Sequence, residues 1–254
     1  MRGRWADGAA SHETFPTAAL GEVVHGSHSD AGAVPAASTP KRGEEMDDQP
    51  RELHDNPVTG ERVVALTDPS EHPDEVLVAQ MTVRPGGRVA AAHHHPTLTE
   101  RFLVLSGEVG FLLDGAELVL GAGEHAVVEP NVVHDWWQVG DEPADVIVEV
   151  TPGVRFKEMI TTIFGLARDG KTNAKGVPSP PQLAVIGSEF SDVIVFETPP
   201  AIVQKLTIAP LAAIGRMRGL QPSYAKYLHG EGTDHPDPRA LAELTPDGRL
   251  RPFD

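Results

Sequence analysis

The chain has 254 residues, a formal net charge of −16 at pH 7, 40% hydrophobic residues and no cysteine. This length suits one compact domain with appendages, and the negative charge argues against a nucleic-acid partner, which requires a basic surface. Without cysteine, disulfides and thiolate metal sites are excluded, so any metal must be held by nitrogen and oxygen ligands. The lack of cysteine is compatible with a reducing compartment, and we expect a cytoplasmic protein.

The first 50 residues are rich in Ala, Gly, Ser, Pro and charged residues and show no apolar periodicity. Such a segment cannot bury enough apolar surface to offset the entropy cost of ordering it. Residues 1–50 are therefore expected to be a disordered tail. An alternative is that translation starts at Met46, which would leave residues 1–45 outside the protein.

Residues 51–152 have the pattern of an antiparallel β-domain, in which short apolar runs alternate with turn signals and helical periodicity is absent. Asp114-Gly115 between two apolar runs is a strong hairpin signal, because both turn positions need positive φ. Many short strands at close spacing indicate a barrel or jelly roll. Strands are expected at 63–66, 76–83, 102–105, 109–113, 118–120, 126–128, 132–137 and 146–150.

After Pro152 the apolar residues follow helical spacing, so residues 153–229 are expected to be a helical extension. Polar, proline-rich residues 230–254 are expected to be a flexible tail. The longest apolar stretch, 201–220, contains lysine, arginine and proline, so no integral membrane segment is expected. Amphipathic helices usually pack on their own domain or on a second subunit, and we expect a homodimer. Helices are expected at 154–168, 183–196 and 202–220.

The segment between Gly87 and Gly107 contains His93, His95 and Glu100. Side chains at i and i+2 of a strand point to the same side, so the two histidines face one direction. Glu100 opens the next apolar run, and neighbouring strands would bring its carboxylate to the two imidazoles. His134 follows the next turn-rich segment. Three nitrogens and one oxygen, with coordination positions left over, predict a mononuclear site for a metal such as Fe, Mn, Ni, Co, Cu or Zn.

The spacing of these residues resembles the cupin superfamily. All fixed positions of the first cupin motif, G-x5-H-x-H-x4-E-x6-G, are present as Gly87, His93, His95, Glu100 and Gly107. The resemblance implies a single small, RmlC-like jelly-roll barrel over about two fifths of the chain. It also implies one divalent metal ion per chain, with Fe, Mn, Ni and Zn as the leading candidates. The ligands implied by position are His93, His95, Glu100 and His134.

The second cupin motif, G-x5-P-x-G-x2-H-x3-N, is matched in part. Gly123 and His134 stand at the correct spacing, whereas Glu129 replaces the proline, Asn131 the second glycine and Gln138 the final asparagine. Asn131 is the non-glycine residue best able to adopt a left-handed turn. Gln138 keeps an amide group at the last position.

Three further residues are candidates for a substrate pocket: Phe102, Trp136 and Gln138. By strand alternation Trp136 shares the face of His134 and could form the wall of an interior pocket, although core or interface packing is the more common role of a single tryptophan. Glu100 is the candidate catalytic residue, because a carboxylate ligand that leaves the metal can act as a base.

Three functions remain open at this point. The favoured one is a metal-dependent enzyme of dioxygenase, isomerase or cyclase type, acting on a small organic molecule inside the barrel. A non-catalytic module that binds a metal and a ligand would carry the same residues. A structural barrel whose C-terminal helices dock a partner protein is the third, because fold alone does not settle function.

Overall fold

The structure is a computed structural model that describes residues 49–87 and 91–253. Nearly all of the expected N-terminal tail, and the alternative start at Met46, lie outside the described residues. The strands are β1 Arg51–Asn56, β2 Glu61–Ala65, β3 Leu77–Val83, β4 His93–His94, β5 Thr99–Ser106, β6 Glu108–Leu113, β7 Ala116–Leu120, β8 His125–Val128, β9 His134–Val139, β10 Ala144–Thr151, β11 Val195–Phe196 and β12 Gly232–Asp234. The helices are α1 Val154–Arg168, α2 Pro180–Glu189, α3 Ala201–Met217 and α4 Pro238–Ala242, with a 3-10 turn at Ala225–Tyr227.

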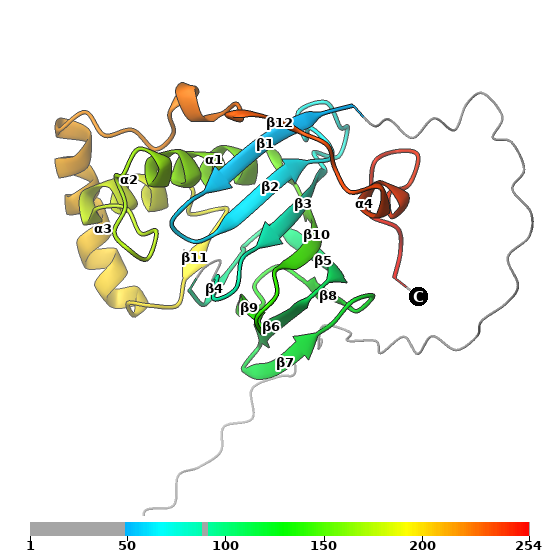
Figure 1. Ribbon diagram of the computed structural model, residues 1–254. Coiled ribbons are helices and arrows are strands. Elements are labelled where there is room, and N and C mark those ends of the chain that lie inside the picture. Colours follow the sequence, from blue (N-terminus) through cyan, green and yellow to red (C-terminus); the bar gives the residue numbers. More distant parts are fainter. Residues whose placement is uncertain (1–48, 88–90, 254) are drawn as a thin grey trace, which may run out of the picture.

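The strands form two antiparallel sheets, with α1, α2 and α3 grouped at one side and α4 at the other (Figure 1). The larger sheet has the order β12-β1-β2-β3-β10-β5-β8, and the smaller sheet has the order β11-β4-β9-β6-β7. This confirms the expected mainly-β, jelly-roll class with appended helices. The hairpin predicted at Asp114-Gly115 joins β6 to β7, with φ values of 46° and 83°, and Asn131 adopts the expected left-handed conformation at φ 68°.

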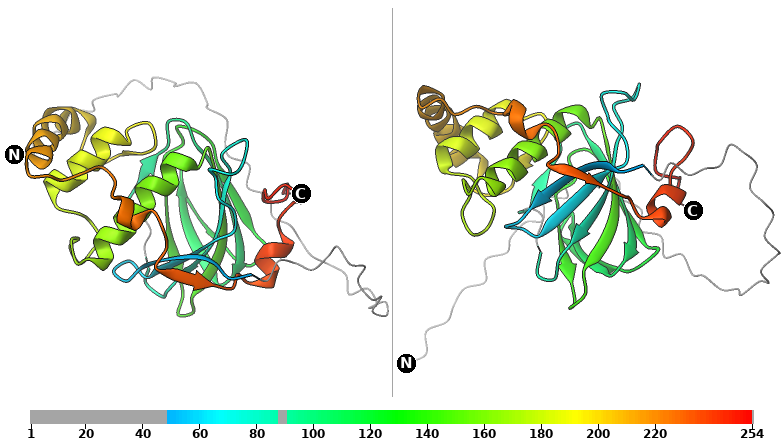
Figure 2. Two further views of the ribbon diagram at one scale, coloured as in Figure 1. Left: turned by 90° about the horizontal axis from the view of Figure 1, so that it is seen from above. Right: turned by 45° about the horizontal axis from the view of Figure 1, so that its top comes forward.

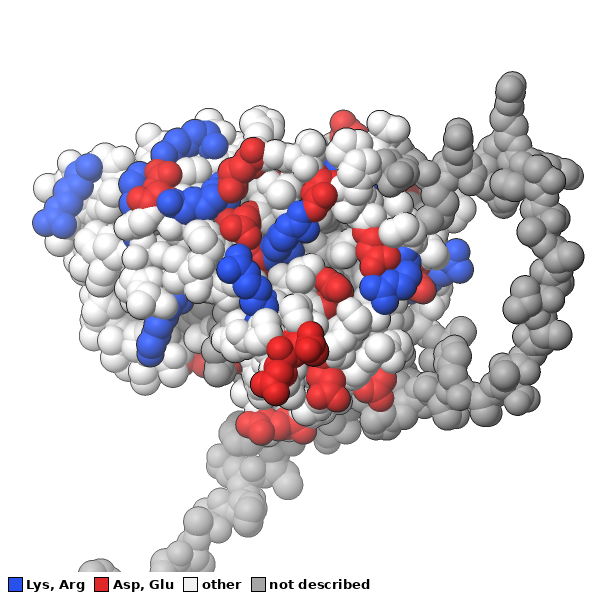
Figure 3. Space-filling model, in the orientation of Figure 1, with Lys and Arg blue, Asp and Glu red and all other residues white. Residues whose placement is uncertain are grey.

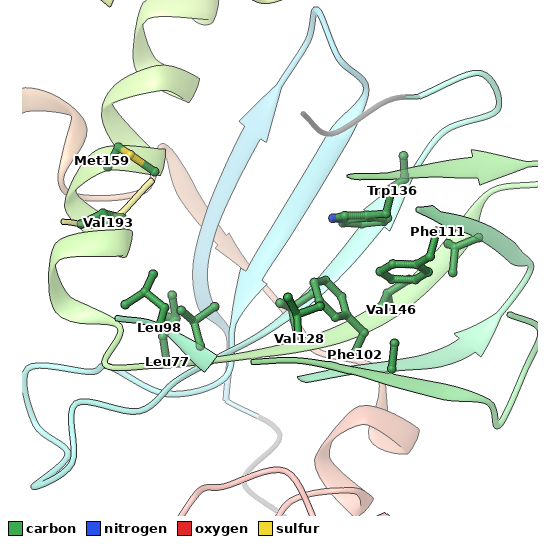
Figure 4. Packing of buried hydrophobic residues seen from close by; sticks show 14 of the residues in the cluster. Leu77, Leu98, Phe102, Phe111, Val128, Trp136, Val146, Met159 and Val193 are labelled. Atoms are coloured by element: carbon green, nitrogen blue, oxygen red, sulfur yellow. The ribbon is translucent and has the colours of Figure 1, made fainter. Parts of the chain in front are cut away.

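The core lies between the two sheets, because alternate strand residues point inward. Trp136 stacks on Phe111 with ring centroids 5.9 Å apart, and Phe102 meets both rings edge-on at 5.7 and 5.1 Å. Figure 4 shows these three rings pointing toward one another, and it shows Met159 of α1 lying beside Val193 at the other end of the same cluster. The helical extension therefore contributes to the barrel core.

Helix α1 matches the expected helix 154–168, and it lies next to the sheets, whereas α3 is the outermost helix (Figure 2). The helix expected at 183–196 begins earlier and ends earlier, as α2. Pro180 and Pro181 occupy the first positions of α2, where a missing N–H has no cost. Residues 193–196 leave the helix because their β-branched and aromatic side chains suit a strand, and Val195–Phe196 pairs with β4 as β11.

The C-terminal segment, expected to be a flexible tail, contains β12, which pairs with β1, and α4. Ala240 and Leu250 are buried together with Val78, Leu103 and Ile147, on the face of the larger sheet that points away from the core. The sequence pattern gave no sign of this contact, because single apolar residues separated by Pro, Gly and charged residues show no periodicity.

The surface is strongly acidic around the hairpin of β6 and β7, where the exposed acids include Glu108, Asp114 and Glu117 (Figure 3). On the face seen in Figure 3, the described lysines and arginines are interspersed with acids and form no continuous basic area. Within the described ranges, no helix reaches the length and apolar character that a membrane crossing demands.

Candidate metal centre

Four buried side chains from both sheets meet at one point. His93 and His95 come from β4 and the residue after it, and His134 begins β9, directly opposite His93 in the register. Glu100 comes from β5 of the facing sheet. One nitrogen or oxygen atom from each side chain lies within 4.8 Å of the others, and all four side chains are buried. The structure brings together the four residues that the sequence singled out.

Each imidazole is oriented by its Nδ1 atom, which lies at hydrogen-bond distance from a backbone carbonyl. The pairs are His93 with Ala91 O at 2.8 Å, His95 with Val193 O at 2.5 Å, and His134 with Val132 O at 3.1 Å. A carbonyl oxygen only accepts hydrogen bonds, so each Nδ1 must carry the proton. In a neutral imidazole this leaves the lone pair on Nε2, as it is in most metal-ligating histidines.

The Nε2 atoms of His95 and His134 lie 3.2 and 2.9 Å from Oε2 of Glu100. Among the described residues, none of these three buried atoms has a hydrogen-bond partner of acceptable geometry. Lone pairs that point at one another in a buried site repel unless an electron acceptor lies between them. A cation satisfies all three atoms at once, so the donor set fits one divalent metal ion with three nitrogen ligands and one oxygen ligand.

Burial and the neighbouring side chains shift the pKa values of three cluster residues. Burial, and then the neighbouring His134 and His95, lower the pKa of His93 to about 3, so this imidazole is neutral. Burial alone would raise the pKa of Glu100, but the His95 and His134 imidazoles lower it well below its usual range. Burial lowers the pKa of His95, but the Glu100 carboxylate and the Val193 carbonyl together raise it above its usual value. A proton and a metal ion therefore compete for Nε2 of His95.

The cluster forms part of the wall of a cavity of about 1060 Å³ between the sheets and α1. His93, Glu100 and His134 line it, together with mostly apolar side chains. Phe102 and Trp136, which the sequence placed in a pocket, both line this cavity. A volume of this size is typical of a site for a small organic ligand.

Gln138, the third pocket candidate, does not line the cavity. Its Oε1 accepts a hydrogen bond from the backbone N–H of Gly86 at 2.8 Å, and its Nε2 donates to the carbonyl oxygens of Val139, Gly140 and Glu142. Through these hydrogen bonds the amide group of Gln138 holds two loops together. The expectation of a substrate contact for Gln138 is therefore corrected to one of loop bracing.

Sequence reasoning missed the contribution of the helical extension to the site. Besides the carbonyl of Val193, the ring of Phe156 lies 5.9 Å from that of His95, and the ring of Phe196 lies 5.9 Å from that of His93. The only signal was the short β-branched and aromatic run at residues 193–196, and periodicity cannot separate such a run from a buried piece of helix.

Comparison with known proteins agrees with this geometry. The model of the cupin domain family matches residues 79–150. A germin-like protein 2-4 of Oryza sativa subsp. japonica is 37% identical over 121 residues, which cover 43% of this chain and 52% of that protein. The chain thus spans about half the length of the curated relative that it matches.

Several solved structures are also similar over part of the chain. KdgF from Halomonas sp. has a TM-score of 0.36 and 17% identity, covering 40% of this chain and 86% of that one. A sugar phosphate isomerase from a cupin superfamily, from Silicibacter pomeroyi, has a TM-score of 0.35 and 21% identity, covering 44% and 75%. An RmlC-like cupin from Shewanella frigidimarina has a TM-score of 0.35 and 22% identity, covering 46% and 92%. Residues 79–150 of this chain match the cupin domain family, and the two antiparallel sheets are consistent with the jelly roll of that family.

Proposed function

We propose that this protein is a mononuclear metal-dependent enzyme that acts on a small organic molecule in the cavity. One observation carries the proposal: buried donor atoms of His95, His134 and Glu100, without hydrogen-bond partners among the described residues, converge beside a large, mainly apolar cavity that Glu100 and His134 line. His93, His95, Glu100 and His134 would hold one divalent ion, of Fe, Mn, Ni or Zn. Such an ion supplies Lewis acidity, and electron transfer if it is redox-active.

The roles of the side chains follow from their positions. Phe102 and Trp136 bind the apolar part of the substrate, because their rings line the cavity beside the cluster. The mainly apolar lining of the cavity would strengthen the electrostatic interactions of the reacting groups. Glu100 is the candidate base: its Oε2 atom, on which both imidazoles converge, would accept and return a proton when the carboxylate is not bound to the metal. Proton transfer by Glu100 suits an isomerase or a cyclase, whereas oxygen consumption would identify a dioxygenase.

Metal analysis of the protein purified without a polyhistidine tag is the first test, and one equivalent of a divalent transition metal per chain is expected. Oxygen uptake is then measured with Fe- or Mn-loaded protein and a panel of enediols, flavonols and phenols, while proton exchange into the same compounds is followed by NMR. The Glu100→Gln variant keeps the size of the side chain and removes the base, so turnover should fall by at least about 100-fold. Metal binding without any turnover across the panel would favour a non-catalytic binding module.

We also propose a homodimer that forms through α3. This helix exposes large apolar side chains, with Ile202 64%, Leu206 70% and Met217 85% accessible. Soluble monomers rarely expose adjoining apolar side chains of this size on one element. A second copy of the chain would bury them, and sedimentation of the wild-type protein measures the oligomeric state directly.

A further inference from the structure

The cavity has polar groups besides the candidate metal centre. His54 and Asn56 on β1 and Glu61 on β2 all line it, and all three are buried. In the register of the two strands, Asn56 lies opposite Glu61 and His54 lies opposite Val63. Strand alternation therefore puts His54, Asn56 and Glu61 on the same face of the larger sheet, the face that borders the cavity.

Two of these residues have unused hydrogen-bonding atoms. One carboxyl oxygen of Glu61 accepts from the Thr59 hydroxyl, but Oε1 has no hydrogen-bond partner within the described part of the chain. Both ring nitrogens of His54 also lack a hydrogen-bond partner among the described residues, and Nε2 lies 3.5 Å from Oε2 of Glu52. The side chain of Asn56 differs, because its Oδ1 accepts from the backbone of the turn that follows. Buried polar atoms without partners are costly, and a ligand that fills the cavity would supply them.

Both side chains are uncharged near neutral pH. Burial raises the pKa of Glu61 to about 8, against a smaller lowering by the Thr59 hydroxyl, so the carboxyl group is protonated and can donate. Burial also lowers the pKa of His54, against a smaller raising effect of Glu52. An uncharged donor and an uncharged imidazole suit a hydroxyl or carbonyl group on a ligand.

Along the larger sheet, Glu61 is well separated from the metal ligand Glu100. Through β10, Glu100 is aligned with Leu77, the first residue of β3, whereas Glu61 is paired with Val83, the last residue of β3. The length of such a strand is about 20 Å. The wall between the two ends includes Ala79, Met81 and Val148, which are apolar.

We propose that Glu61 and His54 form a second subsite, which binds a hydroxyl or carbonyl oxygen at the remote end of an elongated, mainly apolar substrate. The inference rests on the proposed function, because it assumes that the near end of the substrate lies at His93, Glu100 and His134. Glu61 and His54 are positioning residues in this arrangement. They select the substrate by its length and by the oxygen at its far end.

A homologous series of straight-chain hydroxamic acids, each with and without a terminal hydroxyl group, tests this subsite. The hydroxamate binds the metal, and calorimetry measures the dissociation constant with metal-loaded protein. At one chain length the terminal hydroxyl should tighten binding to the wild type by about threefold to tenfold, the range for one net hydrogen bond. The Glu61→Leu variant should lose that gain. The control Val63→Ala, at the next cavity-facing position of β2, should keep it.

The two proposals fail in different ways. A hydroxamate without the terminal hydroxyl that binds the wild type but not His134→Ala supports the metal centre, whatever the terminal hydroxyl does. No gain at any chain length, or a gain that survives in Glu61→Leu, overturns the subsite. Straight-chain alcohols, which carry no metal-binding group, give a second readout through the infrared carbonyl band of protonated Glu61, assigned by its loss in Glu61→Gln. A band that these alcohols leave unshifted also overturns the subsite, even if the metal centre is misassigned.

Discussion

Replacing His134 with alanine should abolish the stabilisation that a bound metal gives to the protein. The side chain is 1% exposed and contributes one of the four donor atoms of the cluster. A metal present at about 100 times its dissociation constant stabilises a folded protein by about 2.7 kcal/mol. For a chain of this size, each kcal/mol raises the melting temperature by about 2–4 °C. The wild type should therefore gain about 5–10 °C on metal addition, and His134→Ala should gain almost nothing at the same metal concentration.

The measurement pairs metal content with the melting temperature of the apo and metal-loaded forms. Truncating a buried side chain has a cost of its own, so the quantity compared is the increment caused by metal in each variant. His125→Ala is the matched control, because it removes another buried imidazole, one that stacks on Phe253 at 4.0 Å and lies outside the cluster. That variant should melt lower and keep its metal increment. If His134→Ala retained one metal per chain and the full increment, the assignment of ligands would be refuted.

Three further predictions concern stability and assembly. Burial raises the pKa of Glu61 from 4.5 to about 8, so its contribution to stability is complete below about pH 4.5 and is lost as the pH rises toward 8. In urea unfolding between about pH 5 and about pH 8, the wild type should lose about 4 kcal/mol more stability than Glu61→Gln. Parallel stability curves for the two proteins would contradict this. Phe102→Ala should cost about 3–5 kcal/mol in urea unfolding and leave metal content unchanged, whereas a loss below about 1 kcal/mol would mean that the ring is not packed as described. Leu206→Glu should convert a sedimenting dimer into a monomer, and a monomeric wild type would refute the dimer through α3.

The strands could be predicted where an apolar run fills most of a strand and turn signals flank it. β3, β5, β6 and β10 are of this kind, and each overlaps an expected strand. β4 and β11 are two residues long and β12 is three, so they are too short to show a recognisable pattern. These short strands depend on pairing with distant segments, as Val195–Phe196 does with β4. Whether these short segments form strands therefore depends on tertiary contacts and not on local propensity.

The residues of the site also fall into those that local sequence spacing predicts and those that only the folded chain brings together. His93, His95 and Glu100 lie within one short segment, and their spacing on two adjacent runs already indicates convergence. The polar lining of β1 and β2 was not foreseen. A buried glutamate at the start of a strand reads as a solvated charge unless the sheet beside it is known to face a cavity. Glu61 acquires its raised pKa only from the completed fold, in which α1 and both sheets exclude water.

The hydrogen bond between His95 and the carbonyl of Val193 links the cluster to the helical extension. The motif residues set which atoms can bind a metal, but the orientation of one imidazole depends on a carbonyl far along the chain. Val193 is held in turn by packing in the barrel core and by the pairing of β11 with β4. Coupling free energies are reciprocal. If docking of this segment on the barrel increases the affinity for metal, then metal binding stabilises the docked segment by the same free energy. The extension therefore belongs to the centre itself, and a cupin barrel with the same four ligands but a different partner for His95 would bind metal with a different affinity.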